Sequence, residues 1–182
     1  MNSAFKSQDG FTLIELLTVT ALIAIAAMLA VPSMASFIRS NRATGEINQL
    51  GASIRYTKSE AVKRGLPVII CSSSDSIQCS TSSSWNIGWI IFVDSNSNGI
   101  FDNGDILLKA EQKFSSSDQL LASSSTSVVK FNRDGFSFGL PSSGSLTFKL
   151  TTSPQDNSAQ RCLLIGMSGN FNIVRQGASG CA

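Results

Sequence analysis

The chain carries one long apolar stretch near its start, and this stretch holds a single acidic residue. From Phe11 to Ile38 the sequence is mostly apolar with a few Ser and Thr, and Glu15 is the one charged residue within it. About 20 apolar residues are enough to cross a bilayer as a helix, so the stretch has the length of a membrane span. A carboxylate in hydrocarbon costs roughly 3 kcal/mol or more. Glu15 therefore needs a cation nearby or a function that outweighs this cost.

The residues around Glu15 form a pattern that suggests where the cation comes from. Residues 10–17 read GFTLIELL and resemble the processing site of type IV pilins and type II secretion pseudopilins. The resemblance implies that a prepilin peptidase removes residues 1–10 as a leader, by cutting between Gly10 and Phe11, and methylates the new N-terminus of Phe11. The new ammonium would then pair with Glu15 of the same subunit or of a neighbouring one. A carboxylate in the first helical turn is also favoured by the helix dipole.

Two other interpretations of the stretch stay open. It could be an ordinary membrane anchor in which Glu15 extends to the lipid headgroups. It could also be the signal peptide of a soluble secreted protein, cut after the small-residue site Ser33-Met34-Ala35. The signal-peptide interpretation leaves Glu15 unexplained, and the apolar stretch is longer than a signal peptide needs.

The helical pattern continues beyond the apolar stretch but changes character. Residues 11–38 are apolar all round and are expected to form the transmembrane half of one long helix. Residues 39–64 are amphipathic, with Ile47, Leu50 and Ile54 at helical spacing. This second half is expected to pack on a folded head.

Three further residues should shape this helix. Pro32 removes one backbone hydrogen bond and predicts a kink, which membrane helices tolerate better than soluble ones. Pilins share a proline at about this depth, which adds to the resemblance. Gly65 followed by Pro67 predicts the end of the helix.

After Pro67 the sequence changes to short runs with the alternation of β-strands. Trp85 and Trp89 are expected in the core of this region. The fold class is therefore α+β, a long N-terminal helix packed on an antiparallel β-sheet head at residues 65–182. The expected strands are residues 68–71, 88–93, 106–108, 128–131, 136–138, 146–150, 162–165 and 171–174.

Two further segments indicate which family of pilin-like proteins the chain resembles. Residues 59–65, SEAVKRG, and residues 85–94, WNIGWIIFVD, with Cys71 between them, resemble the GspH/FimT family of minor pilins and pseudopilins. The resemblance covers most of the chain and is weakest over residues 110–160. It implies a structural subunit, not an enzyme, that assembles with other pilins or pseudopilins at the tip of a type IV pilus or type II secretion pseudopilus.

Four cysteines lie downstream of the apolar stretch, at Cys71, Cys79, Cys162 and Cys181. Four cysteines allow three pairings, and proximity in the sequence favours Cys71–Cys79 and Cys162–Cys181. An even number of cysteines beyond a membrane anchor indicates an oxidising compartment such as the bacterial periplasm. With the resemblance, this predicts a single-pass protein of the inner membrane whose head lies in the periplasm.

One loop of the head has the spacing of a calcium-binding loop. Residues 94–105 read DSNSNGIFDNGD, with oxygen-bearing side chains at loop positions 1, 3, 5, 9 and 12 and glycine at position 6. Position 12 is Asp instead of Glu, and the preceding residues have a strand pattern instead of a helical one. We therefore favour a metal-free turn and expect no cofactor. The candidate calcium ligands are Asp94, Asn96, Asn98, Asp102 and Asp105.

A DNA-binding or adhesive role at the pilus tip is the alternative function. DNA-capturing members of the FimT type carry a basic Gly-Arg-x-Arg element near the C-terminus. The corresponding residues 169–175 read GNFNIVR, with Asn170 and Asn172 in place of the arginines and Arg175 as the one cation. Nucleic-acid binding depends on clustered Lys and Arg, and the net charge is only +2. Nucleic acid is therefore not an expected partner.

Overall fold

The structure is a computed structural model of the chain and describes residues 10–181, without the side chains of residues 29–32. Within this range helix α1 (Leu13–Arg64) is followed by nine β-strands. The chain divides into two compact units, with the boundary between Ile38 and Arg39. The residues of α1 up to Ile38 belong to the first unit, and its remaining residues belong to the second.

Helix α1 ends where the sequence predicts. The N–H of Gly65 donates to the carbonyl of Ala61 at 3.0 Å, and Gly65 has a φ of +66°, which glycine adopts without strain. Within the last turn, Arg64 Nε donates to Glu60 Oε2 at 2.6 Å, the favourable order for charges four residues apart. Pro32 lies within the helix at a position whose side chain is not described, so the kink expected there stays a prediction.

The nine strands form two antiparallel sheets. The first has the order β3-β2-β1-β5-β6, and the second has the order β4-β7-β8-β9. The strands are β1 (Val68–Ser72), β2 (Gly88–Val93), β3 (Ile106–Gln112), β4 (Gln119–Ala122), β5 (Val128–Phe131), β6 (Ser137–Phe138), β7 (Ser145–Thr151), β8 (Arg161–Gly166) and β9 (Phe171–Arg175).

The head differs from the expectation in two respects. Each of the eight expected runs overlaps a strand, and the expected α+β fold with an antiparallel head is confirmed; the division of the strands into two sheets was not part of the expectation. The second sheet begins with β4, which was not expected. This strand is only four residues long and alternates exposed and buried side chains, so its apolar signal is weak.

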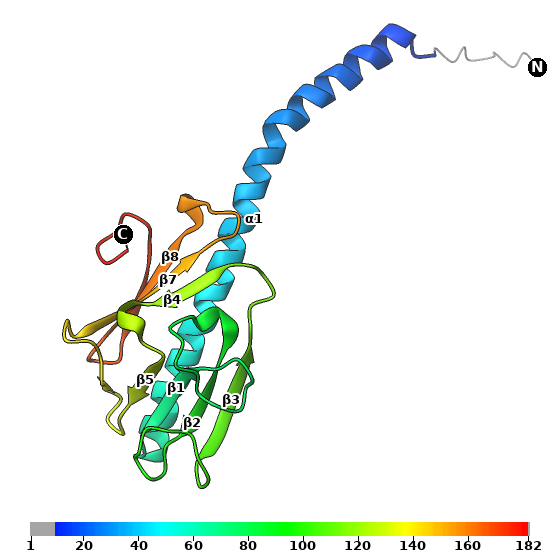
Figure 1. Cartoon of the computed structure of the whole chain (residues 1–182). Coiled ribbons are helices and arrows are strands. Elements are labelled where there is room, and N and C mark those ends of the chain that lie inside the picture. The colour runs from blue at the N-terminus through cyan, green and yellow to red at the C-terminus, as the bar shows by residue number, and fades with distance from the viewer. Residues whose placement is uncertain (1–9, 182) are drawn as a thin grey trace, which may run out of the picture. The chain divides into compact units, whose positions relative to one another are not determined.

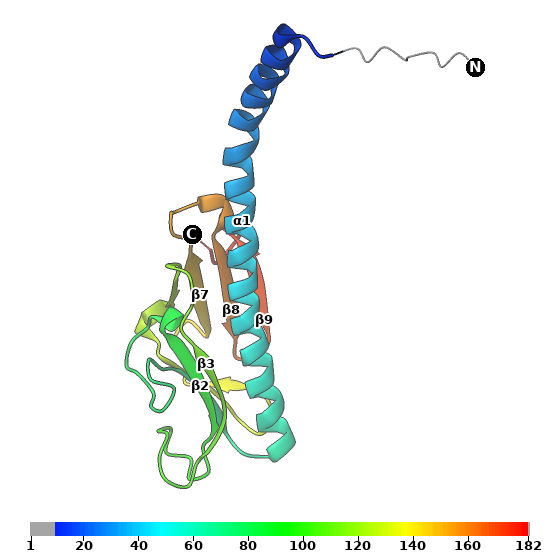
Figure 2. The same cartoon turned by 90° about the vertical axis from the view of Figure 1, so that its right-hand side faces the viewer.

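Both sheets bury their apolar faces against the same stretch of helix. Ile47, Leu50 and Ile54 of α1 are almost completely buried in one continuous core. Figures 1 and 2 show the second half of α1 lying along the strands of the head. Burying a side chain of this size contributes about 1.5–3 kcal/mol. The core residues from the first sheet are Val68, Ile70, Trp89, Ile91, Val93, Val129 and Phe131, and those from the second are Leu120, Ala122, Leu146, Phe148, Leu150, Leu163 and Ile165.

The two tryptophans pack in this core, as expected. Trp85 meets Phe148 edge to face at 5.0 Å between ring centroids, and its Nε1 donates to the carbonyl of Thr126 at 3.0 Å. Trp89 meets Phe114 edge to face at 6.1 Å. Neither indole is exposed, so both contribute to packing between the layers.

The first sheet is also covered on its other face. Ile69, Ile90 and Phe92 form a second, smaller cluster there, against which Phe101 and Cys79 pack from two loops. The rings of Phe92 and Phe101 are 5.0 Å apart. A strand buried on both faces has no polar alternation. This explains why β2 is apolar throughout.

Two glycines of α1 provide a matched test of the helix packing. A Cβ on Gly51 would lie 3.0 Å from the ring of Phe171, whereas a Cβ on Gly45 would meet nothing within 4 Å. We predict that Gly51→Leu lowers stability, by about 1–3 kcal/mol for overpacking. Gly45→Leu should raise stability by up to about 1 kcal/mol, because leucine is the better helix former. Thermal unfolding of the full chain in detergent measures both variants, and equal effects at the two positions would contradict the packing.

Candidate processing and assembly site

The residues around the expected cleavage point are fully accessible. Phe11 is 92% exposed, and Gly10 has no atom within 4 Å of the position a Cβ would take. Both residues precede the first helical residue, Leu13. A peptidase could therefore reach the Gly10–Phe11 bond without unfolding a helical turn.

Thr12 and Glu15 cap the start of α1 reciprocally. The backbone N–H of Thr12 donates to Glu15 Oε2 at 3.2 Å, and the N–H of Glu15 donates to Thr12 Oγ1 at 3.3 Å. The Thr12 hydroxyl also donates to Glu15 Oε2 at 3.2 Å. This is a capping box, in which two otherwise unpaired backbone donors at the helix start are satisfied by side chains.

The capping box was not part of the sequence-based prediction, although the Thr-x-x-Glu spacing of residues 12–15 encodes it. It gives Glu15 a local structural role beside the expected charge pairing. Phe11 is joined to Gly10 by a peptide bond in this chain, so pairing between its ammonium and Glu15 stays a prediction.

The first half of α1 exposes its apolar side chains on all sides. Among the described helices, α1 is the one long and apolar enough to cross a membrane by length and composition, and none of its most apolar window is buried. The large exposed side chains of this half are Leu13, Ile14, Leu16, Leu17, Val19, Leu22, Ile23, Ile25, Met28, Met34, Phe37 and Ile38.

The four cysteines form two disulfides, and both pairings are the local ones that the sequence favours. Cys71 pairs with Cys79 across a Cα–Cα distance of 5.5 Å, and Cys162 pairs with Cys181 across 5.6 Å. The first bond ties β1 to the loop that follows it, and the second ties the C-terminal segment to β8. Each bond therefore fixes a segment without regular secondary structure to a buried strand.

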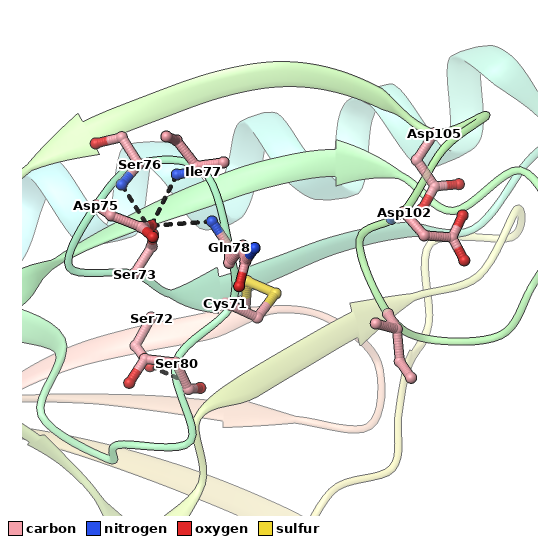
Figure 3. Close-up of a disulfide and its surroundings, with 12 residues drawn as sticks. Cys71, Ser72, Ser73, Asp75, Ser76, Ile77, Gln78, Ser80, Asp102 and Asp105 are labelled. Atoms are coloured by element: carbon pink, nitrogen blue, oxygen red, sulfur yellow. Dashed lines mark hydrogen bonds between the residues drawn. A yellow bond between two sulfur atoms is a disulfide. The ribbon is translucent and has the colours of Figure 1, made fainter.

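The loop closed by Cys71–Cys79 is organised around Asp75 (Figure 3). The backbone N–H groups of Gln78 and Ile77 both donate to Asp75 Oδ1 at 2.9 Å, and the Ser73 hydroxyl donates to the same oxygen at 3.1 Å. The Gln78 bond, followed by that of Ile77, lowers the pKa of Asp75 from its ordinary value.

The acidic loop at residues 94–105 is held by hydrogen bonds within the loop. Asp94 accepts the N–H groups of Asn98 at 3.1 Å and Gly99 at 2.8 Å. Asp105 accepts the N–H groups of Ser95 at 2.9 Å and Asp102 at 3.1 Å. These contacts are the side-chain-to-backbone bonds with which Asp builds turns.

The remaining candidate ligands of the loop also bond one another. Asn98 Nδ2 donates to Asp102 Oδ2 at 2.6 Å, and Asn96 Nδ2 lies 3.3 Å from both carboxylate oxygens of Asp102. Across residues 10–181, no three His, Cys, Asp or Glu side chains are grouped as a metal site requires. Phe101 anchors the same loop by packing on Phe92. These bonds are those of an Asx-type turn, and a loop without calcium stays a prediction.

The structure brings two more cations to the segment that corresponds to the DNA-binding element. Lys58 Nζ donates to the carbonyl of Ser168 at 3.0 Å and to Asn170 Oδ1 at 2.9 Å. The guanidinium of Arg55 lies 4.9 Å above the ring of Phe171. Both side chains come from α1 and were not expected here. Each is engaged in packing the helix on β9 and the turn before it.

Comparison with protein families decides the identity of the chain. The family model for the prokaryotic N-terminal methylation motif matches residues 5–31, and the model described as type II transport protein GspH matches residues 46–169. The second match covers well over half of the sequence. The chain belongs to the GspH family. The expected GspH/FimT resemblance is thereby confirmed, and with it membership of a family of structural pilins and pseudopilins.

Solved structures confirm the fold of this GspH-family chain. It is similar to two crystal structures of the type IV minor pilin FimU of Pseudomonas aeruginosa, in space groups P21 and P65. The first is 20% identical with a TM-score of 0.58, over 76% of this chain and 92% of the other. The second is 20% identical with a TM-score of 0.52, over 70% and 88%. A comparison with curated proteins gave no match.

Calcium addition tests the acidic loop of this GspH-family protein. We predict nearly coincident melting curves for the full chain in detergent with millimolar calcium and with chelator, because the loop oxygens already accept hydrogen bonds. A weak site with a Kd of about 10⁻⁴ M would add about 1.4 kcal/mol at about 1 mM calcium, a readily measured shift. A calcium-dependent rise in Tm that Asp94→Ala abolishes would show that the loop binds the ion.

Proposed function

We propose that the chain is a structural subunit, a minor pilin or pseudopilin, processed by prepilin peptidase and assembled at the tip of a type IV pilus or type II secretion pseudopilus. The observation that carries the proposal is the capped acid of Glu15 at the start of an exposed apolar helix, directly after an accessible Gly10–Phe11 bond. This arrangement lies inside the matched methylation motif.

The exposed half of α1 requires a partner of apolar character. Soluble monomers rarely expose continuous apolar surface of this extent, so the side chains between Leu13 and Ile38 must be buried elsewhere. A bilayer before assembly and the helices of neighbouring subunits after assembly both provide that environment. The same helix then serves as membrane anchor and as filament core.

The domain organisation follows from this role. Residues 1–10 form the leader, residues 11–38 the transmembrane half of α1, residues 39–64 the half that packs on the head, and residues 65–182 the head. The two disulfides are compatible with an oxidising compartment, which supports a periplasmic head on an inner-membrane anchor.

The proposed role of Glu15 in the filament is to pair with the N-terminal ammonium of Phe11. A charge buried among apolar helices is costly unless it is paired, so the pair would favour one register between neighbouring helices. The capping box holds the Glu15 carboxylate beside the backbone of Thr12, one residue from the expected new N-terminus. This position supports the proposal that Glu15 pairs with the ammonium once the bond is cut.

We predict that the mature protein begins at Phe11 with one added methyl group. Gly10→Ala should block this processing, because the Cβ is added at the scissile residue. Apart from its chain neighbours, the new Cβ would meet no atom of residues 10–181 within 4 Å, so a block would reflect recognition by the peptidase and not a clash within the described structure. Intact mass and N-terminal sequencing of membrane-extracted protein measure the outcome, and Gly45→Ala is a matched control that should be processed normally.

Two results would contradict the prediction that the mature protein begins at Phe11. A mature start at Ser36 would favour a conventional signal peptide. Retention of Met1 in filament-associated protein would exclude processing as a requirement for assembly.

We predict that Glu15→Ala and Glu15→Gln are both processed but both assemble poorly. Leaving the buried ammonium unpaired costs about 3–5 kcal/mol. Incorporation into sheared filaments should therefore fall by more than about tenfold.

The glutamine variant separates the two roles of Glu15. Gln can still accept the N–H of Thr12 in a capping box but carries no charge. If Glu15→Gln assembled like the wild type while Glu15→Ala did not, helix capping would explain the requirement and the charge-pairing proposal would be wrong.

A further inference from the structure

A cluster of charged side chains, of which Asp118 is buried and Arg42 and Glu46 are half-buried, joins the start of the head-packed half of α1 to the segment between β3 and β4. Arg42 binds the Asp118 carboxylate with two hydrogen bonds, from Nε to Oδ2 at 2.8 Å and from Nη2 to Oδ1 at 2.7 Å. The Asp118 side chain is completely buried, and its Oδ1 also accepts the N–H of Ser153 at 2.7 Å. Asp118 thus has its hydrogen bonds satisfied as a carboxylate.

Glu46 lies one helical turn after Arg42 and faces the same cluster. Its Oε1 accepts the hydroxyl of Ser116 at 2.6 Å. Its Oε2 is buried and has no hydrogen-bond partner among the described residues. The Ser116 hydroxyl that donates to Glu46 also accepts the N–H of Asp118 at 3.2 Å, so the two carboxyl groups belong to one cluster. Two carboxylates cannot share a hydrogen bond unless one of them carries a proton.

We propose that Glu46 holds a proton on Oε2 and donates it to the Asp118 carboxylate, so that a shared proton closes the contact between α1 and the β3–β4 segment. The unpartnered buried oxygen becomes a donor, and the cluster then contains one carboxylate, one carboxylic acid and one guanidinium. The contact therefore depends on pH.

The surroundings of Glu46 raise its pKa, which favours the protonated form that the proposal requires. Burial is the largest influence and raises the pKa of Glu46, and both the charge and the hydrogen bonding of Asp118 raise it further. The Ser116 hydroxyl and the Arg42 charge act in the opposite sense, and the net pKa is raised.

Two more charged groups line the cavity beside Glu46. Lys113 and Glu111 contribute to its wall, together with Gln49. Glu111 is engaged by Lys109 Nζ at 2.6 Å and by Gln49 Nε2 at 2.9 Å. The cavity gives Glu46 a route for exchanging its proton with solvent, since it is open to the surface and partly polar.

The pH dependence follows from the raised pKa. Below the ordinary glutamate pKa, Glu46 is protonated in both the folded and the unfolded chain, and its contribution to stability is fully present. As the pH rises, the unfolded chain releases this proton first, so the contribution is lost up to the folded pKa of Glu46. Beyond that pH the two buried carboxylates repel each other, and the attachment of α1 to residues 113–118 weakens.

Glu46→Gln tests the proposal, because its amide can donate to Asp118 and accept from Ser116 at every pH. For the full chain in detergent, we expect a higher Tm than the wild type at about pH 8 and the same Tm at about pH 4. Glu60→Gln is the matched control on the same helix. The pKa of Glu60 is lowered, chiefly by the hydrogen bond from Arg64, so this variant should have a lower Tm than the wild type at about pH 8.

A direct measurement keeps the proposal testable if Glu46→Gln does not fold. The chain has four glutamates, Glu15, Glu46, Glu60 and Glu111. NMR of the wild-type protein labelled with carbon-13 at glutamate Cδ follows their titration separately, with Ser116→Ala to assign the resonance of Glu46 by its shift. We expect Glu46 to titrate above the ordinary glutamate value. Titration of Glu46 at or below the ordinary value, or a Glu46→Gln variant less stable than the wild type at about pH 8, would overturn the proposal.

Discussion

Both sheets of the head depend on one stretch of helix for their core. Residues 39–64 of α1 bring Ile47, Leu50 and Ile54 into the one core that residues of both sheets share. Small sheets need such a partner to be stable in water. Any force or displacement applied to this helix segment therefore acts on the whole head at once, because the core is continuous across both sheets.

Much of this fold could be predicted from local patterns, and the misses have physical causes. The helix end at Gly65 and the strand β2 have strong signals, since glycine adopts positive φ readily and a doubly buried strand is apolar throughout. The division into two sheets could not be predicted, because pairing between distant strands leaves no local mark on either. Strand β4 was missed because half of its four side chains are exposed.

The candidate site also combines features that local sequence patterns predict with features that only the folded chain brings together. The spacing of Gly10, Phe11 and Glu15 led to the motif that the family comparison matches, and Thr-x-x-Glu contained the capping box as well. The charge cluster of Arg42, Glu46 and Asp118 joins residues more than 70 positions apart, so only the folded chain reveals it. Glu15 and Glu46 are two acids of one helix, one proposed to depend on an ammonium and the other on a proton.

The smaller apolar cluster on the other face of the first sheet separates the exposed loops of the head from the core that stabilises it. Phe101 and the Cys71–Cys79 bond attach two polar loops to Ile69, Ile90 and Phe92, on the face opposite the shared core. The loop residues between these attachment points can change in length and charge without altering any contact to α1. A head built this way can acquire new surface chemistry on that face while the packing of α1 on the head stays the same.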